Sequence, residues 1–417
     1  MDNSKVWLPC GLSSVVPEVK TQFRGFEKMS RKRKRLEAVC RANGCDKVLL
    51  ITETEKNTVI LCSSCNRRIQ RLCDKEGMHW FTAHLDESYI MASSRPEILP
   101  SSTLPLERVS PDHSPVEAIR LARTVIKEAT SILILAGAGA SVDSGLPDFR
   151  GAKGFYRYRD REIPMETINF HDDRGGDLAI SWGFILRMMN MFSTCKPHEG
   201  YDLVRKICEQ KNMKRESSTF VFTSNIDGYF ERAGFDRDSV YECHGSTNYL
   251  QCIDLCKRRA KNEVYHIDEF NKPKVDKEYN SCDRWWRNIK FEKENLRVLN
   301  MDVIPTCPSC AKILRPNISH VTDQPEDICY LRKRKQELKL LDWLRKNKNE
   351  NVCIIEIGCG TSEHSLRDES ELLLANTLTN GHLIRIDPGC CDVPEGHVGI
   401  KLGFKEALLE ICKEKMF

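Results

Sequence analysis

A glycine-rich segment at residues 137–151 carries the clearest chemical signal in this sequence. It reads Gly-Ala-Gly-Ala-Ser-Val-Asp-Ser-Gly-Leu-Pro-Asp-Phe-Arg-Gly and directly follows the apolar run 131–136. Gly137 and Gly139 have no Cβ, so a turn built on them lets backbone N–H groups approach a pyrophosphate closely. A tight turn between a strand and a helix also favours glycine, so Gly-x-Gly alone fits a purely structural turn equally well.

Polar side chains follow a second apolar run, residues 219–223. Ser224, Asn225 and Asp227 come directly after it, and parallel sheets present ligand groups at the carboxyl ends of their strands. The alternative is a plain turn, since Asn, Asp and Gly all favour turns. Further along, His244 lies in Glu-Cys-His-Gly-Ser. Because imidazole titrates near neutral pH, His244 can act as a general base toward a hydroxyl, although single histidines are often structural.

Two cysteine pairs downstream have the spacing of metal ligands. Cys252 and Cys256 form the first pair, and Cys307 and Cys310 form the second. Four thiolates would complete a tetrahedral zinc site and leave no open coordination position. We therefore expect a structural zinc that holds a small module together, not a catalytic metal.

The insert between the two pairs leaves two questions open. Cys243 and Cys282 lie close enough in the sequence to compete as ligands, and the alternative for both is a free buried thiol. The insert also contains Trp285 and Trp286. This pair either packs on the domain or forms a surface for a partner.

The amino-terminal part has its own metal-ligand pattern. Its apolar residues form a small core that a metal would stabilise, and the pattern resembles a C2H2 or BED-type zinc finger. An alternative ligand set combines Cys40 and Cys45 with the first two of the finger's ligands, and unmetallated cysteines remain a further alternative. The expected finger ligands are Cys62, Cys65, His79 and His84.

Composition bounds the class of protein. The 417 residues are 40% apolar and 30% charged, which predicts a globular protein of more than one domain. Residues 1–20 lack the pattern of a secretory signal, and no apolar run is long enough for a bilayer, so we expect an intracellular protein that contacts no membrane. The 20 cysteines include metal-type pairs, which fits a reducing compartment. The net charge of +4 is mild, but residues 31–35 read Arg-Lys-Arg-Lys-Arg.

The sequence divides into four parts. The short apolar runs 131–136, 219–223, 352–357 and 382–386 predict an α/β fold with a Rossmann-like parallel sheet, because buried parallel strands read as short apolar runs. Proline and serine mark a linker before this domain. The expected parts are a basic tail (1–35), a separate zinc finger (36–92), the linker (93–115) and a catalytic domain (116–417) that holds a zinc-ribbon module at about 243–320.

The whole segment 137–151 resembles the cofactor loop of the sirtuins, which are NAD-dependent protein deacylases. The strings 225–227, 244–245 and 360–362 resemble further motifs of the same family. The resemblance covers about residues 116–413 and implies an NAD-binding catalytic domain. It implies that NAD is contacted by Gly137, Ala138, Gly139, Ser141, Asp148, Phe149, Arg150, Ser224, Asn225, Asp227, Gly360, Thr361 and Ser362.

The resemblance also implies a reaction. In the family, the acyl-lysine oxygen attacks C1′ of the nicotinamide ribose, nicotinamide leaves, and a histidine helps a ribose hydroxyl to attack the resulting alkylimidate. His244 stands at the position of that histidine, and Asn225 stands in the nicotinamide-pocket motif. These two are therefore the expected catalytic residues, and the expected products are free lysine, nicotinamide and O-acyl-ADP-ribose.

Several positions depart from the family pattern. Ser224 replaces a glutamine, and Phe-Gly-Glu is absent from the segment 315–323. Residues 363–365 replace Leu-x-Val, and Arg385 stands where the family usually has asparagine, which implies altered edges of the substrate and adenosine sites. Residues 182–188 lack the Tyr-x-x-Arg of relatives that prefer acidic acyl groups, so succinyl-type substrates are not expected.

Three functions fit this sequence. The first is an NAD-dependent lysine deacylase that its finger directs to chromatin, with an acyl-lysine protein such as a histone as substrate. The second is an NAD hydrolase or mono-ADP-ribosyltransferase, which the missing Phe-Gly-Glu favours. The third is a catalytically idle module that binds NAD and DNA. Next to a zinc finger, the basic run 31–35 favours contact with DNA and a nuclear location. The alternative is a solvated tail and a cytoplasmic location.

Overall fold

The computed structural model forms two compact units, which are described separately. One comprises Met1–Leu106 with Ala375–Thr377, and the other comprises Glu107–Leu374 with Leu378–Phe417. No helix in the part described is long and apolar enough to cross a bilayer. The structure describes residues 23–24, 35–40, 47–52, 107–111, 113–149, 154–158, 161–164, 167–171, 176–255, 264–271, 284–292, 294–320, 322–323, 327–361 and 366–413.

The first unit contains an antiparallel sheet of three strands. The order is β1 (Phe23–Arg24), β2 (Arg35–Cys40) and β3 (Lys47–Thr52), with Cys40 opposite Lys47 at the end of the β2–β3 ladder. All four expected finger ligands lie outside the described residues, as do the linker residues 93–106. The finger and the division into four parts therefore stay predictions.

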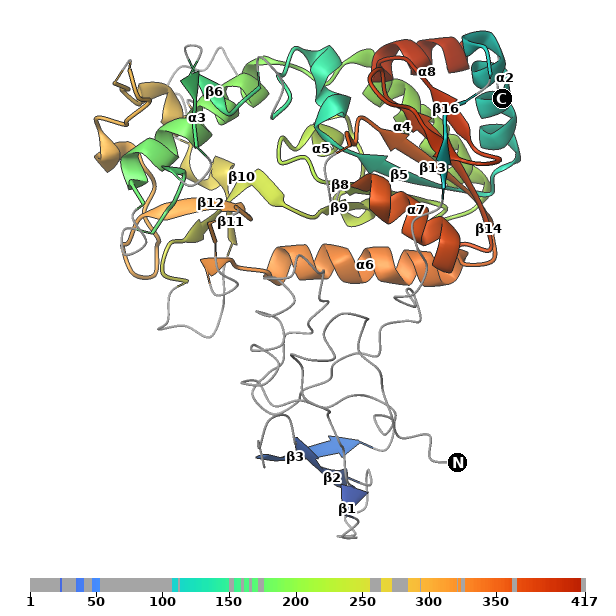
Figure 1. Ribbon diagram of the computed structural model, residues 1–417. Helices are drawn as coiled ribbons and strands as arrows, with labels where there is room; N and C mark the ends of the chain where they lie inside the picture. Colours follow the sequence, from blue (N-terminus) through green and yellow to red (C-terminus); the bar gives the residue numbers. More distant parts are fainter. Residues whose placement is uncertain are drawn as a thin grey trace. The chain divides into compact units, whose positions relative to one another are not determined.

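A parallel sheet of six strands organises the second unit (Figure 1). Numbered by their succession along the chain, its strands stand in the order 6-5-4-1-2-3, which is the doubly wound order of dinucleotide-binding folds. The predicted Rossmann-like α/β fold is thus confirmed. The strand order reverses between β5 and β13, and ligands bind beyond the carboxyl ends of the strands at such a point. The strands are β16 (Val398–Ile400), β14 (Asn380–Ile386), β13 (Asn351–Ile357), β5 (Ser131–Ala136), β8 (Thr219–Thr223) and β9 (Val240–Glu242).

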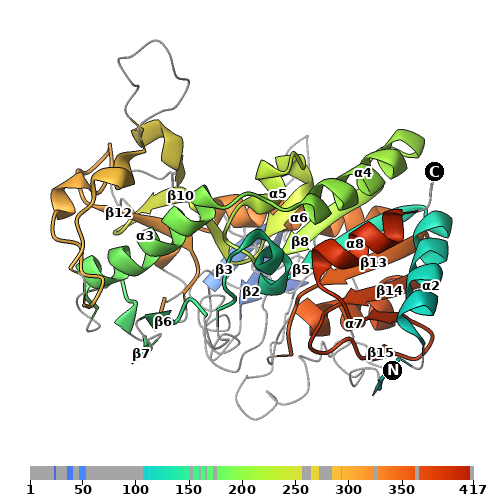
Figure 2. The ribbon, with the colours of Figure 1, turned by 90° about the horizontal axis from the view of Figure 1, so that it is seen from above.

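Helices cover both faces of this sheet because side chains alternate along each strand (Figure 2). On β5, Ile132 and Ile134 face the core under α2 (Pro115–Glu128), α4 (Glu199–Lys214) and α8 (Phe404–Cys412). Leu133 and Leu135 face the core under α6 (Leu331–Asn347) and α7 (Leu366–Asn376). Burial on both faces explains why this strand is a continuous apolar run.

An antiparallel sheet forms a second module. Its strands stand in the order β11 (Val264–His266), β10 (Gly245–Cys252) and β12 (Leu314–Ile318), and α3 (Leu178–Thr194) packs beside it. The remaining helices and strands are short. They are β4 (Arg108–Val109), η3 (Ala138–Ser144), β6 (Arg157–Tyr158), β7 (Arg161–Glu162), α5 (Tyr229–Arg232), η6 (Arg237–Ser239), η7 (Ile267–Phe270), η8 (Trp285–Asn288), η9 (Met301–Val303) and β15 (Val393–Pro394).

The described part of the long insert packs on α3. Trp285 and Trp286 are both buried, and the ring of Trp285 meets that of Trp182 edge to face at 5.8 Å. Trp182 Nε1 also donates to the carbonyl of Leu314 at 3.2 Å. A Cβ at Gly183 would overlap the carbonyl oxygen of Leu296, so the insert lies directly against the helix backbone. The tryptophan pair is therefore part of the core.

Candidate active site

Two glycine-rich loops meet at the reversal of strand order. The N–H of Gly139, after β5, donates to the carbonyl of Gly358, after β13, at 3.0 Å. A Cβ at Gly137 would lie 2.6 Å from the same carbonyl oxygen, and Gly358 has a φ of +55°. Glycine is thus required here for contact between the loops. At Gly360, in contrast, a Cβ would meet no atom of the described residues within 4 Å.

Three of the predicted cofactor residues contact one another beside these loops. Ser141 Oγ donates to Asp227 Oδ2 at 2.6 Å, and Asn225 Nδ2 donates to Ser141 Oγ at 3.4 Å. Asn225 and Asp227 are only 4% and 6% exposed. Ser141 lies in η3 after β5, while the other two follow β8, which pairs with β5. The parallel pairing therefore brings the two strand ends together, as the sequence led us to expect.

Two further residues at this point were missed by sequence reasoning. The Tyr201 hydroxyl lies 3.0 Å from Ser141 Oγ, and Tyr201 is fully buried. His198 caps α4, because its Nδ1 accepts the N–H of Gly200 at 3.0 Å. Its Nε2 therefore carries the proton and donates to the carbonyl of Ala140 at 3.0 Å. Tyr201 fits the apolar spacing of α4, and His198 precedes the helix as its N-cap, so the sequence offered no chemical signal for either.

Burial sets the proton affinities of these groups. It raises the pKa of Asp227, against the opposing effect of hydrogen bonds from Ser141 and from a backbone N–H. It also raises the pKa of Tyr201 well above its usual value, so this hydroxyl keeps its proton. For His198, burial lowers the pKa and so favours the neutral ring. The site thus combines one buried carboxyl with neutral donors.

His244, the expected general base, lies in the turn between β9 and β10. His244 is exposed, and its backbone carbonyl accepts the N–H of Ser319 at 2.9 Å. The preceding residue, Cys243, donates its N–H to the carbonyl of Thr223 at 2.9 Å. Because β9 pairs with β8, this turn neighbours the loop of Asn225 at the same edge of the sheet. The following Gly245 has a φ of +83°, which allows the sharp change of direction into β10.

The other expected NAD contacts are distributed along the same edge. Ser224 donates its N–H to the carbonyl of Ala136 at 3.1 Å, directly after β8. Phe149 packs on Phe155 with ring centroids 5.4 Å apart. Ala138 opens η3, Asp148 follows it, and Thr361 is exposed after β13. Arg150 and Ser362 lie outside the described residues.

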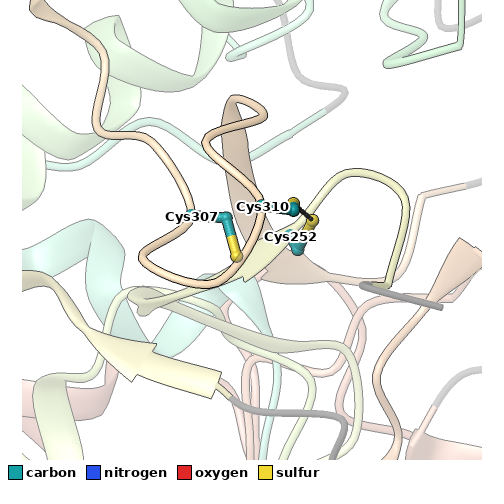
Figure 3. Close-up of side chains that lie close together, drawn as sticks. All are labelled: Cys252, Cys307 and Cys310. Carbon is teal, nitrogen blue, oxygen red and sulfur yellow. Dashed lines mark hydrogen bonds between the residues drawn. The ribbon is translucent and has the colours of Figure 1, made fainter. Parts of the chain in front are cut away.

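Three of the expected zinc ligands converge in the antiparallel module (Figure 3). The sulfur atoms of Cys252, Cys307 and Cys310 all lie within 4.8 Å of one another, and Cys252 Sγ is 3.5 Å from Cys310 Sγ. Cys256 lies outside the described residues. Cys243 is not part of this group: it packs with the core under α6 and α7, and burial raises its pKa to about 12. A set of converging thiols suits zinc.

A second cluster, of His171, Asp323 and Asp327, also brings possible ligand atoms within 4.8 Å. The buried guanidinium of Arg315 lies among them, with Nη1 2.6 Å from Asp323 Oδ1 and 3.4 Å from His171 Nε2. Arg315 thus supplies the positive charge that a metal ion would bring. The Asp323 carboxylate also accepts the N–H of His320 at 2.7 Å, so the cluster holds these two residues of the segment that replaces Phe-Gly-Glu.

Arg385 stands one residue before the carboxyl end of β14, and its side chain points into the interior. The altered adenosine edge stays a prediction. The Arg385 side chain is fully buried and lies opposite Glu356 of β13. Nε donates to Glu356 Oε1 at 2.7 Å, and Nη2 donates to Glu371 Oε1 at 2.9 Å. The side chain at the strand end is that of Asp387, which accepts the backbone N–H groups of Gly389 and Cys390. Arg385 is therefore part of an internal ion-pair network.

Comparison with known families gives an assignment for this site. Residues 137–341 match the model of the Sir2 family. This confirms the sirtuin resemblance for a segment that contains Ser141, Asn225, Asp227 and His244. The Sir2-like segment also includes the three converging cysteines, whereas β13, β14 and the loop at Gly360 follow it.

Individual relatives of the Sir2-like segment carry similar names. The chain is 30% identical over 141 residues to NAD-dependent protein deacylase 2 of Pseudomonas aeruginosa, which covers 34% of this chain and 52% of that protein. It is 26% identical over 214 residues to the NAD-dependent protein deacylase of Candida albicans, with 46% and 65% covered. The chain thus spans less than two thirds of the length of either relative. Among solved structures, a Sir2 homologue–NAD complex matches with a TM-score of 0.45 and 18% identity, over 70% of this chain and 92% of that one.

Proposed function

We propose that this protein is an NAD-dependent protein lysine deacylase that releases nicotinamide and O-acyl-ADP-ribose. The observation that carries the proposal is the buried contact of Ser141 with Asn225 and Asp227, beside the reversal point of a doubly wound sheet. The relatives named above, which are called NAD-dependent protein deacylases, support the same activity. The acyl-lysine substrate is a protein, and a histone is our proposed example.

The residues at this edge suit NAD in their size and chemistry. Among the described residues, none would touch a Cβ at Gly360, which leaves room for a ligand there. The buried amide of Asn225 and carboxyl of Asp227 supply polar contacts. NAD would supply the glycosidic bond that breaks when nicotinamide leaves. We assign Asn225 and Asp227 to the nicotinamide end. His244, in the exposed turn beside them, is assigned the role of accepting a ribose hydroxyl proton.

Nicotinamide release by the full-length protein tests this proposal, measured with and without a panel of acyl-lysine peptides. We expect release only with peptide, together with formation of the free lysine. His244→Ala should abolish turnover and retain NAD binding. His382→Ala is the matched control, because His382 is an exposed histidine at the opposite end of the sheet, near the start of β14. Full activity of His244→Ala would refute the role of His244.

One observation favours a second candidate, an NAD hydrolase or mono-ADP-ribosyltransferase. The segment without Phe-Gly-Glu is joined to the turn of His244 through the Ser319 N–H, and Arg315 fixes it through Asp323. An altered segment held next to this turn would change how a peptide enters. Nicotinamide release without any peptide would support this candidate. NAD binding with no release in either case would indicate the third, an idle NAD- and DNA-binding module.

We also propose a structural zinc on Cys252, Cys307 and Cys310, with Cys256 as the fourth ligand. Its support is the convergence of three sulfur atoms. A second zinc in the amino-terminal finger and contact of that finger with DNA rest on sequence spacing alone. Metal analysis of the purified protein tests both zinc sites, and a DNA-binding assay of the full chain tests the finger.

The proposed location is the nucleus, with the cytoplasm as the alternative. It rests on the basic run 31–35, because short runs rich in Lys and Arg can act as import signals. A fluorescent fusion of the full chain tests it. Replacing the five basic residues with Gln should move the fusion out of the nucleus, and unchanged nuclear signal would count against this role.

A further inference from the structure

Tyr201 extends the polar contacts of the site by one more side chain. Its hydroxyl lies 3.0 Å from Ser141 Oγ, on the serine that already contacts Asn225 and Asp227. The tyrosine comes from α4, which forms no part of the two loops at the strand ends. A buried hydroxyl from a third element thus reaches the centre of the proposed nicotinamide site.

Counting protons fixes the direction of these hydrogen bonds. A serine hydroxyl has one proton to donate and can accept two. An ionised Asp227 can only accept, so the Ser141 proton lies on the 2.6 Å contact with Asp227 Oδ2. The amide nitrogen of Asn225 can only donate to Ser141. The remaining contact must therefore be donated by Tyr201, because Ser141 has no second proton for it.

The tyrosine ring is held where this donation is possible. Tyr201 has no exposed surface. Its ring meets Phe230 and Phe404 edge to face, each with centroids 5.1 Å apart, and it also contacts His198 at 5.0 Å. Aromatic edge contacts of this kind favour a single ring orientation. The hydroxyl is thus directed at Ser141.

We infer that Tyr201 is a positioning residue, which donates to Ser141 and thereby directs the Ser141 proton to the ionised Asp227. The effect of Tyr201 on nicotinamide release rests on the proposed function. Its effect on the protonation of Asp227 does not. If Asp227 were protonated, the carboxyl could donate to Ser141, and Ser141 could then donate its own proton to the Tyr201 hydroxyl. Tyr201 opposes that reversal, because its own proton already occupies one acceptor position of Ser141.

Other groups near Asp227 set the background for this effect. Arg232 favours the carboxylate, and the N–H of Tyr229 donates to Asp227 Oδ1 at 2.9 Å. Glu242 is buried and disfavours a second negative charge, although Arg332 pairs with it. The hydroxyls of Tyr201 and Tyr229 stay protonated because burial raises the pKa of each. None of these groups is altered when only the Tyr201 hydroxyl is removed.

The test is Tyr201→Phe, which keeps the ring and removes the donor. In the NAD-free protein with ¹³C-labelled aspartate, the carboxyl signal of Asp227, assigned with Asp227→Asn, should titrate about half to one pH unit higher than in wild type. Tyr241→Phe is the matched control, because Tyr241 is also buried but faces the core under α6 and α7. No difference between wild type and Tyr201→Phe in this titration would overturn the inference.

Turnover gives a second, separate result. In nicotinamide release, Tyr201→Phe should lower kcat about tenfold, leave the KM for NAD within about twofold, and move the acidic limb of the pH profile upward. Tyr201→Phe in a Ser141→Ala background should have no further effect, because Tyr201 acts through Ser141. Additive losses would contradict this. A wild type without turnover would refute the proposed function and leave the titration test intact.

Protein stability is the remaining check. The thermal midpoint of each variant shows whether it folds, and Phe should keep the packing that Tyr201 provides. Should Tyr201→Phe fail to fold, Ser141→Ala interrupts the same chain at the next bond. The Asp227 titration must then move in the same direction, since the carboxylate loses its side-chain donor. An unchanged titration in Ser141→Ala would also overturn the inference.

Discussion

Replacing Arg385 with methionine should destabilise the protein without affecting its affinity for NAD. The buried guanidinium contacts both carboxylate oxygens of Glu356, at 2.7 and 2.9 Å, and Glu371 Oε1 at 2.9 Å. Removing one partner of a buried ion pair costs about 3–5 kcal/mol. Each carboxylate keeps another guanidinium, since Arg367 lies 3.7 Å from Glu356 and Arg108 lies 2.8 Å from Glu371. We therefore expect about 3 kcal/mol, the lower end of that range.

Urea unfolding and the thermal midpoint measure this loss. For a domain of this kind, about 3 kcal/mol corresponds to a decrease of roughly 6–12 °C in the midpoint. Arg120→Met is the control, because Arg120 pairs with Glu117 on the exposed side of α2 and should cost less than about 1 kcal/mol. Equal losses in the two variants would refute the reasoning. A large increase in the Kd for NAD in folded Arg385→Met protein would instead indicate that Arg385 acts at the adenosine edge of the NAD site.

Three more perturbations test other parts of the structure. Burial lowers the pKa of His198, so the unfolded chain binds more protons and stability falls as the pH falls below about 6.5. His198→Asn keeps an oxygen acceptor for the helix N-terminus and should lose part of that dependence, measured by urea unfolding above and below this pH. Cys307→Ser should lose about one zinc per chain by metal analysis, whereas Cys243→Ser, in a different cluster, should retain it. Trp285→Ala should cost about 3–5 kcal/mol in urea unfolding because it opens a cavity beside α3. Leu299→Ala, at a residue that is 62% exposed, should cost less than about 0.5 kcal/mol.

The sequence predicted those parts of the site that depend on one strand and the loop after it. The apolar run of β5 and the glycines at 137 and 139 gave the fold class and the position of the loop. Placing Ser141 near Asn225 required only one more assumption, that both strands belong to the same parallel sheet. The structure adds that these side chains bond to one another, at 3.4 Å.

Features that depend on how elements pair could not be read from the sequence. Arg385 is a buried ion-pair partner only because the strand register puts it opposite Glu356. Tyr201 has the spacing of a core residue on α4, and its hydroxyl gains a role only when the helix lies against η3. Whether Trp285 packs or is exposed depends on its distance from α3, which no local pattern encodes.

The packing of α3 on the insert has a consequence for synthesis on the ribosome. Trp182 meets Trp285 and the carbonyl of Leu314, and both of these follow it by more than about a hundred residues. Synthesis proceeds at about 5–20 residues per second, so the residues that cover the apolar face of α3 are made roughly 5–20 s after it. During that time the nascent chain presents an uncovered helix face to other chains and to chaperones. A fragment that ended before Trp285 would keep this face uncovered, so the yield of soluble protein should depend on whether the insert is included.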